Sequence, residues 1–320
     1  MERIVNTMSF CIRISADHDG RRIDKVIRAV YPNVPLSALM RALRKGEVIL
    51  DSKRARAPNV RVAGGQELCV PWDMEEEALI APEITEEPGK ISKLTEISYI
   101  YKDDAVCIVN KPADLLVQPD AKGGDSVITR VWATFGRGFQ GFSPAAVHRL
   151  DRNTTGVLVV AMSGGALREL ELLFKERLIR KTYLAIVVGN APASGDIQAP
   201  LRKDEENNFV AVDPKGKPSH TRYEKISGGN EYSVVSVELL TGRTHQARVH
   251  LAHIGIPILG DQKYGDVTAN KEWRKLGVER PLLHSHKIIF PEKISDKLLS
   301  AVAGKCFTAT PPDDMQKFLS

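Results

Sequence analysis

The chain has 320 residues, of which 45 are lysine or arginine and 40 are aspartate or glutamate, so its formal net charge is +5. This length accommodates one large and one small domain. The 42% hydrophobic and 27% charged residues are ordinary for a globular protein and exclude an intrinsically disordered chain. The sequence lacks an apolar run near the ~20 residues of a membrane-spanning helix, and its first residues lack the features of a secretory signal. We therefore expect a cytoplasmic protein without a membrane partner.

The four cysteines are far apart and mostly lie among apolar neighbours: Cys11, Cys69, Cys107 and Cys306. The Cys-x-x-Cys spacing of a zinc ribbon or redox motif does not occur among them. We expect all four to be reduced and to fill core positions, and we find little support for a disulfide framework.

The N-terminal segment predicts a small basic module of a strand followed by two helices. Residues 1–15 read as the first strand, and the apolar residues between Ile23 and Val30 recur at helical spacing before Pro32 ends the pattern. A second helix follows, with Ser37 as its expected N-cap and Gly46 as its expected C-terminal cap.

Positive charge is concentrated in this module. Residues 21–61 carry eleven basic and three acidic side chains. Arg41, Arg44 and Lys45 share one face of the second helix, because side chains at i, i+3 and i+4 project together. These three could contact phosphates of an RNA strand; the alternative is a solvated basic face.

An acidic stretch follows the basic module. Residues 73–87 carry seven acidic side chains and no lysine or arginine. RNA would repel this stretch, and the Glu-Pro-Gly after it breaks regular structure. We therefore divide the chain into a domain at 1–75, an acidic linker at 76–94 and a large domain at 95–320.

The large domain begins with two strand-like runs, 97–101 and 105–109, around the turn Lys102-Asp103-Asp104, which predicts a hairpin. Further on, Ser163 is the expected N-cap of a helix at 166–177. Strands and helices alternate without a regular strand-helix-strand rhythm. The predicted class is therefore α+β, with a mixed, largely antiparallel sheet and flanking helices.

The most informative segment is VHRLDRNTTGVLVVA at 147–161, in which Asp151 lies between two arginines before a polar turn. The run 157–161 is typical of a strand buried on both faces. A carboxylate at the mouth of such a strand can be held beside a pocket, with cations keeping it ionised, as a nucleophile or base requires. On spacing alone, a turn aspartate in a salt bridge is the simpler interpretation.

Four further blocks follow in order: KTYLAIVVG at 181–189, LLTGRTHQARVHLAHIG at 239–255, IPILGDQKYG at 256–265 and PLLHSHKIIFP at 281–291. Together with HRLDRNTTG, they resemble the RluA family of RNA pseudouridine synthases over residues 95–310. The resemblance is strongest to members that carry a small RNA-binding domain and modify large-subunit ribosomal RNA. The segment 46–71 likewise resembles the ribosomal-protein-type RNA-binding fold called the alpha-L motif.

The resemblance implies isomerisation of uridine to pseudouridine without a cofactor. Asp151 then corresponds to the essential aspartate, which adds to the base, attacks the sugar carbon or removes a sugar proton; the sequence leaves these three paths open. By position, Arg243 corresponds to the arginine that pairs with this aspartate.

Two more residues acquire roles through the same resemblance. Tyr183 corresponds to a tyrosine that packs against the target base, and alternation along the strand places its ring opposite Thr182 and Leu184. Arg149 corresponds to a residue that fills the space left by the flipped-out nucleotide.

Other functions are weighed against this one. The histidines His148, His245, His250 and His253, with His284 and His286, raise the hypothesis of a metal-dependent hydrolase, but they lack the spacing of known zinc sites, so we expect no metal. The glycines lack the phosphate-binding pattern followed by lysine and serine, so we expect no nucleotide cofactor. Remaining alternatives are the same chemistry on transfer RNA and a non-catalytic RNA-binding assembly factor.

Overall fold

The computed structural model describes residues 10–31, 33–72, 97–120, 124–136, 142–204 and 206–319. Its strands form a four-stranded sheet in residues 10–70, a ten-stranded sheet in the rest of the chain and a separate two-stranded hairpin. The predicted linker at 76–94 lies outside the described residues. Among the helices that the structure describes, none is long and apolar enough to cross a membrane.

The N-terminal module packs two helices against a small antiparallel sheet of order β1-β4-β2-β3. Its elements are β1 (Phe10–Arg13), the 3₁₀ turn η1 (Ala16–His18), α1 (Ile23–Val30), α2 (Leu36–Lys45), β2 (Ile49–Leu50), β3 (Lys53–Arg54) and β4 (Glu67–Val70). The apolar faces of both helices join one buried cluster, which includes Ile23, Ile27, Leu39, Leu43 and Leu68. Both predicted helices are therefore confirmed.

The ends of α2 confirm one predicted cap and correct the other. Gly46 has φ 71° and closes the helix, with its N–H directed at the carbonyls of Ala42 and Leu43. The predicted N-cap at Ser37 is wrong, because the helix begins at Leu36, directly after Pro35. The fixed φ of proline suits the entry to a helix, so the turn begins before the serine.

The cysteine prediction is wrong for one pair. Cys11 and Cys69 face each other across β1 and β4 and form a disulfide. Cys107 is free and buried as expected, whereas Cys306 is free but exposed. The pair could not be identified from the sequence, because the two cysteines are separated by 58 positions and meet only when the chain returns to the neighbouring strand.

The large sheet has the order β10-β13-β14-β9-β15-β8-β6-β5, with β16 on β15 and β7 on β8. Its strands are β5 (Ser98–Lys102), β6 (Val106–Lys111), β7 (Ala145–Ala146), β8 (Thr155–Ala161), β9 (Arg180–Val188), β10 (Ser194–Gln198), β13 (His220–Gly228), β14 (Tyr232–Leu239), β15 (Leu283–Ile289) and β16 (Cys306–Thr308). All of its ladders are antiparallel except that between β15 and β8. The predicted α+β class and the β5–β6 hairpin are confirmed.

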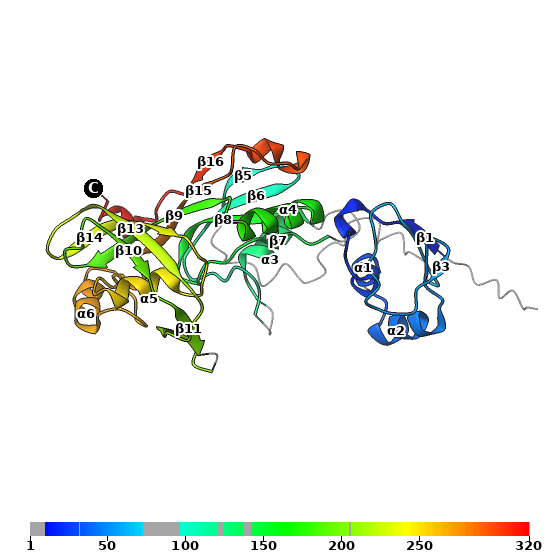
Figure 1. Cartoon of the computed structure of the whole chain (residues 1–320), viewed down its shortest axis with the longest axis horizontal. Helices are drawn as coiled ribbons and strands as arrows, with labels where there is room; N and C mark the ends of the chain where they lie inside the picture. Colours follow the sequence, from blue (N-terminus) through cyan, green and yellow to red (C-terminus); the bar gives the residue numbers. More distant parts are fainter. Residues whose placement is uncertain are drawn as a thin grey trace, which may run out of the picture.

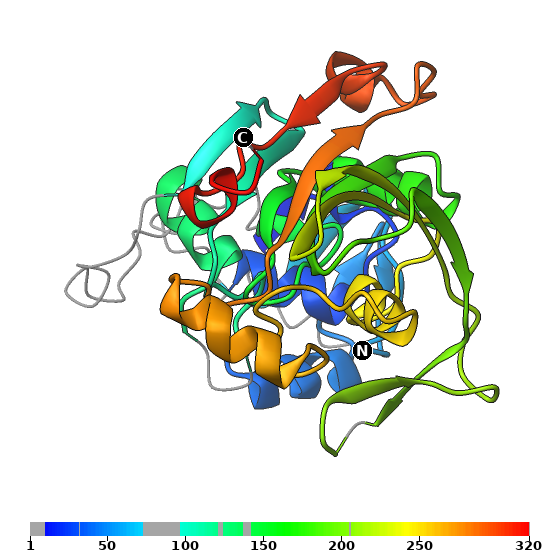
Figure 2. The ribbon, with the colours of Figure 1, turned by 90° about the vertical axis from the view of Figure 1, so that its left-hand side faces the viewer.

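Helices cover both faces of this sheet (Figure 1). They are α3 (Val127–Phe135), α4 (Gly164–Lys175), α5 (Gln246–His253), α6 (Val267–Lys275), the 3₁₀ helix η5 (Lys297–Val302) and α7 (Asp313–Gln316). Alternate residues of β8 join different cores, since Leu158 packs with α3 and α5 whereas Val159 packs with α4 and η5. The prediction that β8 is buried on both faces is confirmed. The remaining hairpin, β11 (Leu201–Asp204) with β12 (Phe209–Val212), extends away from the sheet (Figure 2).

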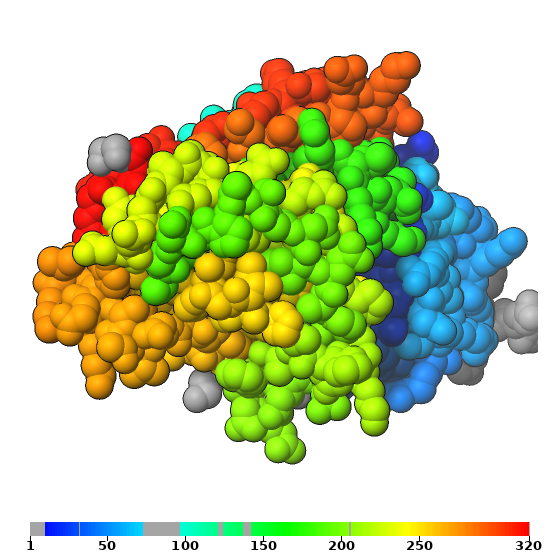
Figure 3. All heavy atoms as spheres, turned by 60° about the vertical axis from the view of Figure 1, so that its left-hand side comes forward, coloured from blue at the N-terminus to red at the C-terminus, as the bar shows by residue number. Residues whose placement is uncertain are grey.

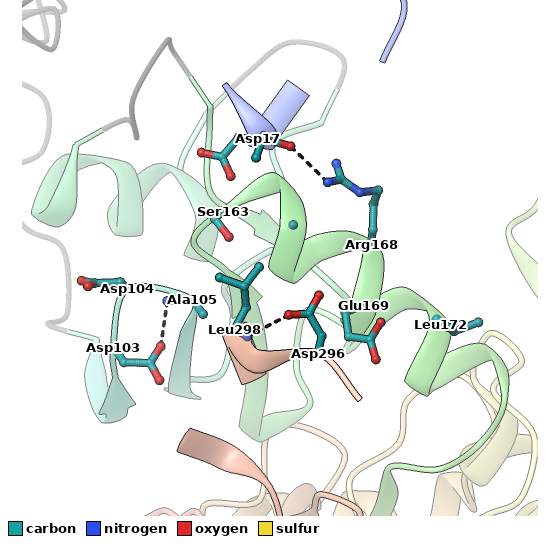
Figure 4. A pocket seen from close by; sticks show the side chains of 12 residues that line it. Asp17, Asp103, Asp104, Ala105, Ser163, Arg168, Glu169, Leu172, Asp296 and Leu298 are labelled. Carbon is teal, nitrogen blue, oxygen red and sulfur yellow. Dashed lines mark hydrogen bonds between the residues drawn. The ribbon is translucent and has the colours of Figure 1, made fainter. Parts of the chain in front are cut away.

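The N-terminal module contacts the start of α4 through η1. Figure 3 shows the module, in blue, lying against the green part of the large domain. The Asp17 carboxylate accepts the backbone N–H of Gly164 at 3.0 Å, and Arg168 donates to the carbonyls of Ala16 and Asp19 at 3.1 and 3.0 Å. A Cβ on Gly164 would lie 1.9 Å from the Asp17 carbonyl oxygen, so only glycine permits this approach. Figure 4 shows Arg168 of α4 reaching toward η1 near Asp17. Ser163 caps α4 as predicted.

Candidate active site

The loop that carries Asp151 connects β7 to β8 and is held from two sides by buried cations. Lys111, at the end of β6, donates to the carbonyl of Arg152 at 2.7 Å and to those of Pro112 and Leu115. Arg280 donates to the carbonyl of Asn153 at 3.1 Å. These contacts fix the backbone directly after Asp151, so the carboxylate sits on a rigid support.

The first of these cations is unusually placed. The Lys111 side chain is fully buried, and this burial, followed by the positive charge of Arg280, lowers its pKa to about 7, against the opposing charge of Asp151. Its three carbonyl acceptors match the three N–H donors of an ammonium group. The role of Lys111 is therefore to position the loop.

The end of the same loop is fixed by close packing of β8 on β15. Gly156 has φ 107°, and a Cβ at this position would lie 2.1 Å from the carbonyl oxygen of Ser285. Next to it, the Thr155 hydroxyl is 2.8 Å from Nδ1 of His284, whose other nitrogen is 3.1 Å from the carbonyl of Ala309. Burial lowers the pKa of His284 to about 4, so this histidine is a neutral structural group.

Asp151 forms its ion pair with Arg248. Nη1 of Arg248 donates to Oδ2 of Asp151 at 3.2 Å, and the two side chains are 11% and 28% exposed. Oδ1 of Asp151 accepts no hydrogen bond from the described residues and lies 3.9 Å from Nε2 of His245. One carboxylate oxygen is thus fixed by the guanidinium, while the other remains available to react.

Arg248 is itself fixed by a second, deeper carboxylate. Its Nε and Nη2 donate to the two oxygens of Asp261 at 2.7 and 2.8 Å, a bidentate contact. Burial would raise the pKa of Asp261, but Arg248 and the backbone N–H groups of Lys263 and Tyr264 lower it below its usual value. Burial would likewise disfavour the charged guanidinium, yet the two carboxylates raise the pKa of Arg248. Arg248 therefore stays charged between Asp261 and Asp151.

The predicted pairing of Asp151 with Arg243 is wrong. Arg243 is exposed, and its Nε donates to the carbonyl of Pro218 at 3.2 Å. The two arginines lie five positions apart in the same block, but α5 begins at Gln246 between them. Arg248 lies within α5 and reaches Asp151, whereas Arg243 remains in the preceding loop.

His245 and Tyr264 complete the wall beside this ion pair. Nδ1 of His245 is 2.7 Å from the Tyr264 hydroxyl, which also accepts the backbone N–H of Val210 at 3.0 Å. The guanidinium of Arg248 lies over the Tyr264 ring, 5.0 Å from its centroid. Burial lowers the pKa of His245, so at neutral pH this imidazole adds little competing positive charge.

Tyr183 lies in the same region of the sheet. It is 5% exposed and shares its face of β9 with Ala185 and Val187, opposite Leu184, as the alternation predicts. Burial raises the pKa of Tyr183, a hydrogen bond with Ser285 opposes this, and the charge of Asp151 adds to it. Tyr183 is thus a neutral phenol within electrostatic reach of Asp151.

The other predicted site residues lie apart from this cluster. Arg149 is exposed on the loop before Asp151. Arg41, Arg44 and Lys45 are exposed on α2, as the helical spacing predicts, and Lys45 lies 3.6 Å from Glu47.

The histidines of the metal hypothesis are dispersed. His250 is buried and lies 2.9 Å both from the Thr221 hydroxyl and from the carbonyl of Ala199, whereas His253 is exposed. Among the described residues, the side chains close enough to share a metal ion are Cys11, Glu67 and Cys69, and the two sulfurs of this group are bonded to each other.

Several residues of the site were not identified from the sequence. Arg248, Asp261 and Tyr264 all lie within blocks that carry the resemblance, so that signal was available, but it did not specify which side chains meet. Lys111 lies in the segment Asn110-Lys111-Pro112, and this sequence likewise did not indicate which groups the lysine contacts. Arg280 had no local signal, because its role depends on the fold that brings it to Asn153.

Comparison with known proteins gives a consistent picture. Residues 105–253 match the family model described as RNA pseudouridylate synthase. The chain is 37% identical over 306 residues to "Ribosomal large subunit pseudouridine synthase C" of Vibrio cholerae, covering 92% of this chain and 93% of the relative. It is 35% identical over 296 residues to the protein of the same name from Escherichia coli K12, covering 87% and 88%.

Solved structures agree with these relatives. The structure of "Human RNA Pseudouridylate Synthase Domain Containing 1" is similar with a TM-score of 0.54 and 25% identity, covering 70% of this chain and 86% of that one. That of "Human RNA Pseudouridylate Synthase Domain Containing 4" has the same TM-score and identity, with coverages of 69% and 93%.

Proposed function

Because the chain belongs to the RNA pseudouridylate synthase family, we propose that it converts specific uridines of large-subunit ribosomal RNA to pseudouridine. In this reaction the N-glycosidic bond of the uridine breaks, the uracil turns, and the sugar is rejoined to a ring carbon. Curated relatives with coverage near 90% of both chains carry the name of a large-subunit pseudouridine synthase, which supports this substrate.

The observation that carries the catalytic assignment is the Asp151–Arg248–Asp261 array. Asp261 holds the guanidinium through two hydrogen bonds, and the guanidinium in turn holds Oδ2 of Asp151. A fixed positive charge holds the partly buried Asp151 in place through Oδ2, and Oδ1 is free to attack the base or the sugar or to accept a sugar proton. We assign Asp151 as the catalytic group and Arg248 as the group that positions it.

Two further side chains, one in the sheet near Asp151 and one exposed on the loop before it, suit the extrusion of a nucleotide. The ring of Tyr183 offers an aromatic surface for the uracil, and its neutral hydroxyl is within reach of a proton in transit. Arg149, exposed two residues before Asp151, suits the space that the extruded nucleotide leaves in the RNA. Extrusion also explains why the catalytic group can be recessed rather than exposed on the surface.

The N-terminal module supplies a second RNA contact in this proposal. Arg41, Arg44 and Lys45 form an exposed basic face on α2, while the opposite face of the helix is buried in the module's own core. We assign residues 1–75 to an RNA-binding domain of the alpha-L type, 76–94 to a linker and 95–320 to the catalytic domain. A ribosomal RNA substrate also makes the cytoplasm the expected site of action.

The test is Asp151→Asn in the full-length protein, with large-subunit ribosomal RNA transcript as substrate. The substitution removes a charge with little change in shape, so we expect pseudouridine formation to fall by at least ~10³-fold while RNA affinity is unchanged. Asp104→Asn, in the exposed β5–β6 turn, is the matched control and should retain full activity. Retained turnover in Asp151→Asn would refute the catalytic assignment, and modification of transfer RNA alone would refute the proposed substrate.

A further inference from the structure

A groove of about 690 Å³ lies between the end of α4 and the end of β14. One wall is the end of α4 with the segment leading into β9, residues 174–181, and the other is the end of β14 with the following loop, residues 238–243. His148 lines it between these walls. Lys181 lies two residues before Tyr183 on β9, and His148 lies three residues before Asp151 on the loop between β7 and β8. The groove and the candidate active site therefore share one strand and one loop.

The lining of the groove is strongly basic. It contains five lysines and arginines, namely Lys175, Arg177, Arg180, Lys181 and Arg243. Its one acidic lining residue, Glu238, lies 3.8 Å from Nη1 of Arg222, and its His220 lies 2.6 Å from Asp196. In the part of the chain that the structure describes, none of the five cations forms an ion pair. The groove therefore presents uncompensated positive charge.

Lys181 is the most informative of these cations. It is half-buried, and its ammonium group lies 5.2 Å from the centroid of the Phe174 ring, which also stacks on His148. Burial lowers the pKa of Lys181. An unpaired lysine in this position is unfavourable for the free protein and becomes favourable when an anion enters the groove.

Arg177 adds an independent observation. It follows the C-cap residue of α4 with φ 58°, in the left-handed region that glycine favours at this position. An arginine in this conformation is strained relative to glycine. The chain thus keeps a cation at the rim of the groove where helix termination alone would favour glycine.

We propose that this groove binds the phosphodiester backbone of the substrate RNA beside the target uridine. Arg177, Arg180 and Lys181 contact the strand from one wall, and Arg243 contacts it from the other. The inference rests on the proposed function and adds the subsite that holds the strand once the base is extruded. It also gives Arg243 a role in RNA binding in place of the pairing with Asp151.

The test uses variants that distinguish a structural role of these side chains from a role in RNA binding. A structural role predicts that the variants lower stability, whereas a binding role predicts that they lower RNA affinity and leave stability unchanged. Arg177→Gly relieves the left-handed strain, and Lys181→Met removes an unpaired charge but keeps the aliphatic stem. We expect neither variant to lower the urea midpoint of unfolding, and both to weaken binding of the large-subunit RNA transcript. In the triple variant Arg177→Gly, Arg180→Ala and Arg243→Ala, affinity should fall on the order of tenfold or more, and the slope of log affinity against log salt should become shallower by about 2.

The matched control is Lys271→Ala, which removes an exposed cation of α6 outside the groove lining and should leave the affinity nearly unchanged. In all these variants kcat at saturating RNA should equal that of the wild type. Unchanged affinity and salt slope in the triple variant would overturn the proposal, as would a fall in kcat without a rise in KM. If the wild-type protein leaves the RNA unmodified, the proposed function is refuted. The proposal for the groove is tested separately, because it depends only on the measured RNA affinities and their salt dependence.

Discussion

At the scale of single residues, the candidate site depends on one guanidinium shared by two carboxylates in different environments. Asp261 is 1% exposed and takes two of the hydrogen bonds of Arg248, so it acts as an anchor. Asp151 is more exposed and takes one, which leaves its second oxygen free. The difference in burial assigns the reactive role to Asp151 and the supporting role to Asp261.

This arrangement predicts the effect of Arg248→Gln. The buried Asp261 would lose its cation, so the free energy of unfolding should fall by about 3 kcal/mol in urea titrations. Asp151 would lose its donor, so kcat should fall by ~10² to 10³-fold in single-turnover assays. Arg243→Gln is the control, and its kcat at saturating RNA should remain that of the wild type. A larger loss of kcat in Arg243→Gln than in Arg248→Gln would contradict the assignment.

The sequence identified Asp151 and the strand that supports it, but it did not identify its partner. The block LTGRTHQARVH offers two arginines of equal chemical suitability, and the choice depends on where α5 begins and which way it points. His245 has φ 53° at this boundary, a conformation that composition does not reveal. The partner of Asp151 is therefore a property of the fold.

At the scale of elements, α2 shows how far periodicity alone can predict. Its buried residues lie on the face that the helical spacing predicts, and its basic residues are exposed on the face that points away from the module's core. Periodicity gave less information on the large sheet, where β8 lies between β6 and β15 and pairs in parallel with the latter. Such neighbours are far apart in sequence, so local patterns do not specify them.

The basic face of α2 predicts the behaviour of a triple variant. Replacing Arg41, Arg44 and Lys45 by alanine retains helix propensity and removes three cations, so the slope of log affinity against log salt should become shallower by about 2 for single-stranded RNA. The charge-preserving variant Arg41→Lys, Arg44→Lys and Lys45→Arg should retain the wild-type slope in filter-binding titrations. An unchanged slope in the alanine variant would show that this face does not contact the RNA.

At the scale of the whole molecule, α4 links the two regions that we assign to RNA binding. Its first turn contacts η1 of the N-terminal module, and its end lines the basic groove. With twelve residues, the helix spans about 18 Å between these points. The helix therefore connects the N-terminal module to the groove.

The most direct test of the account is a map of pseudouridines in large-subunit ribosomal RNA from cells that lack this gene. The account predicts that specific pseudouridines disappear, that the wild-type gene restores them, and that the Asp151→Asn gene, expressed at an equal level, does not. An unchanged map in the deletion strain, or full restoration by Asp151→Asn, would contradict it.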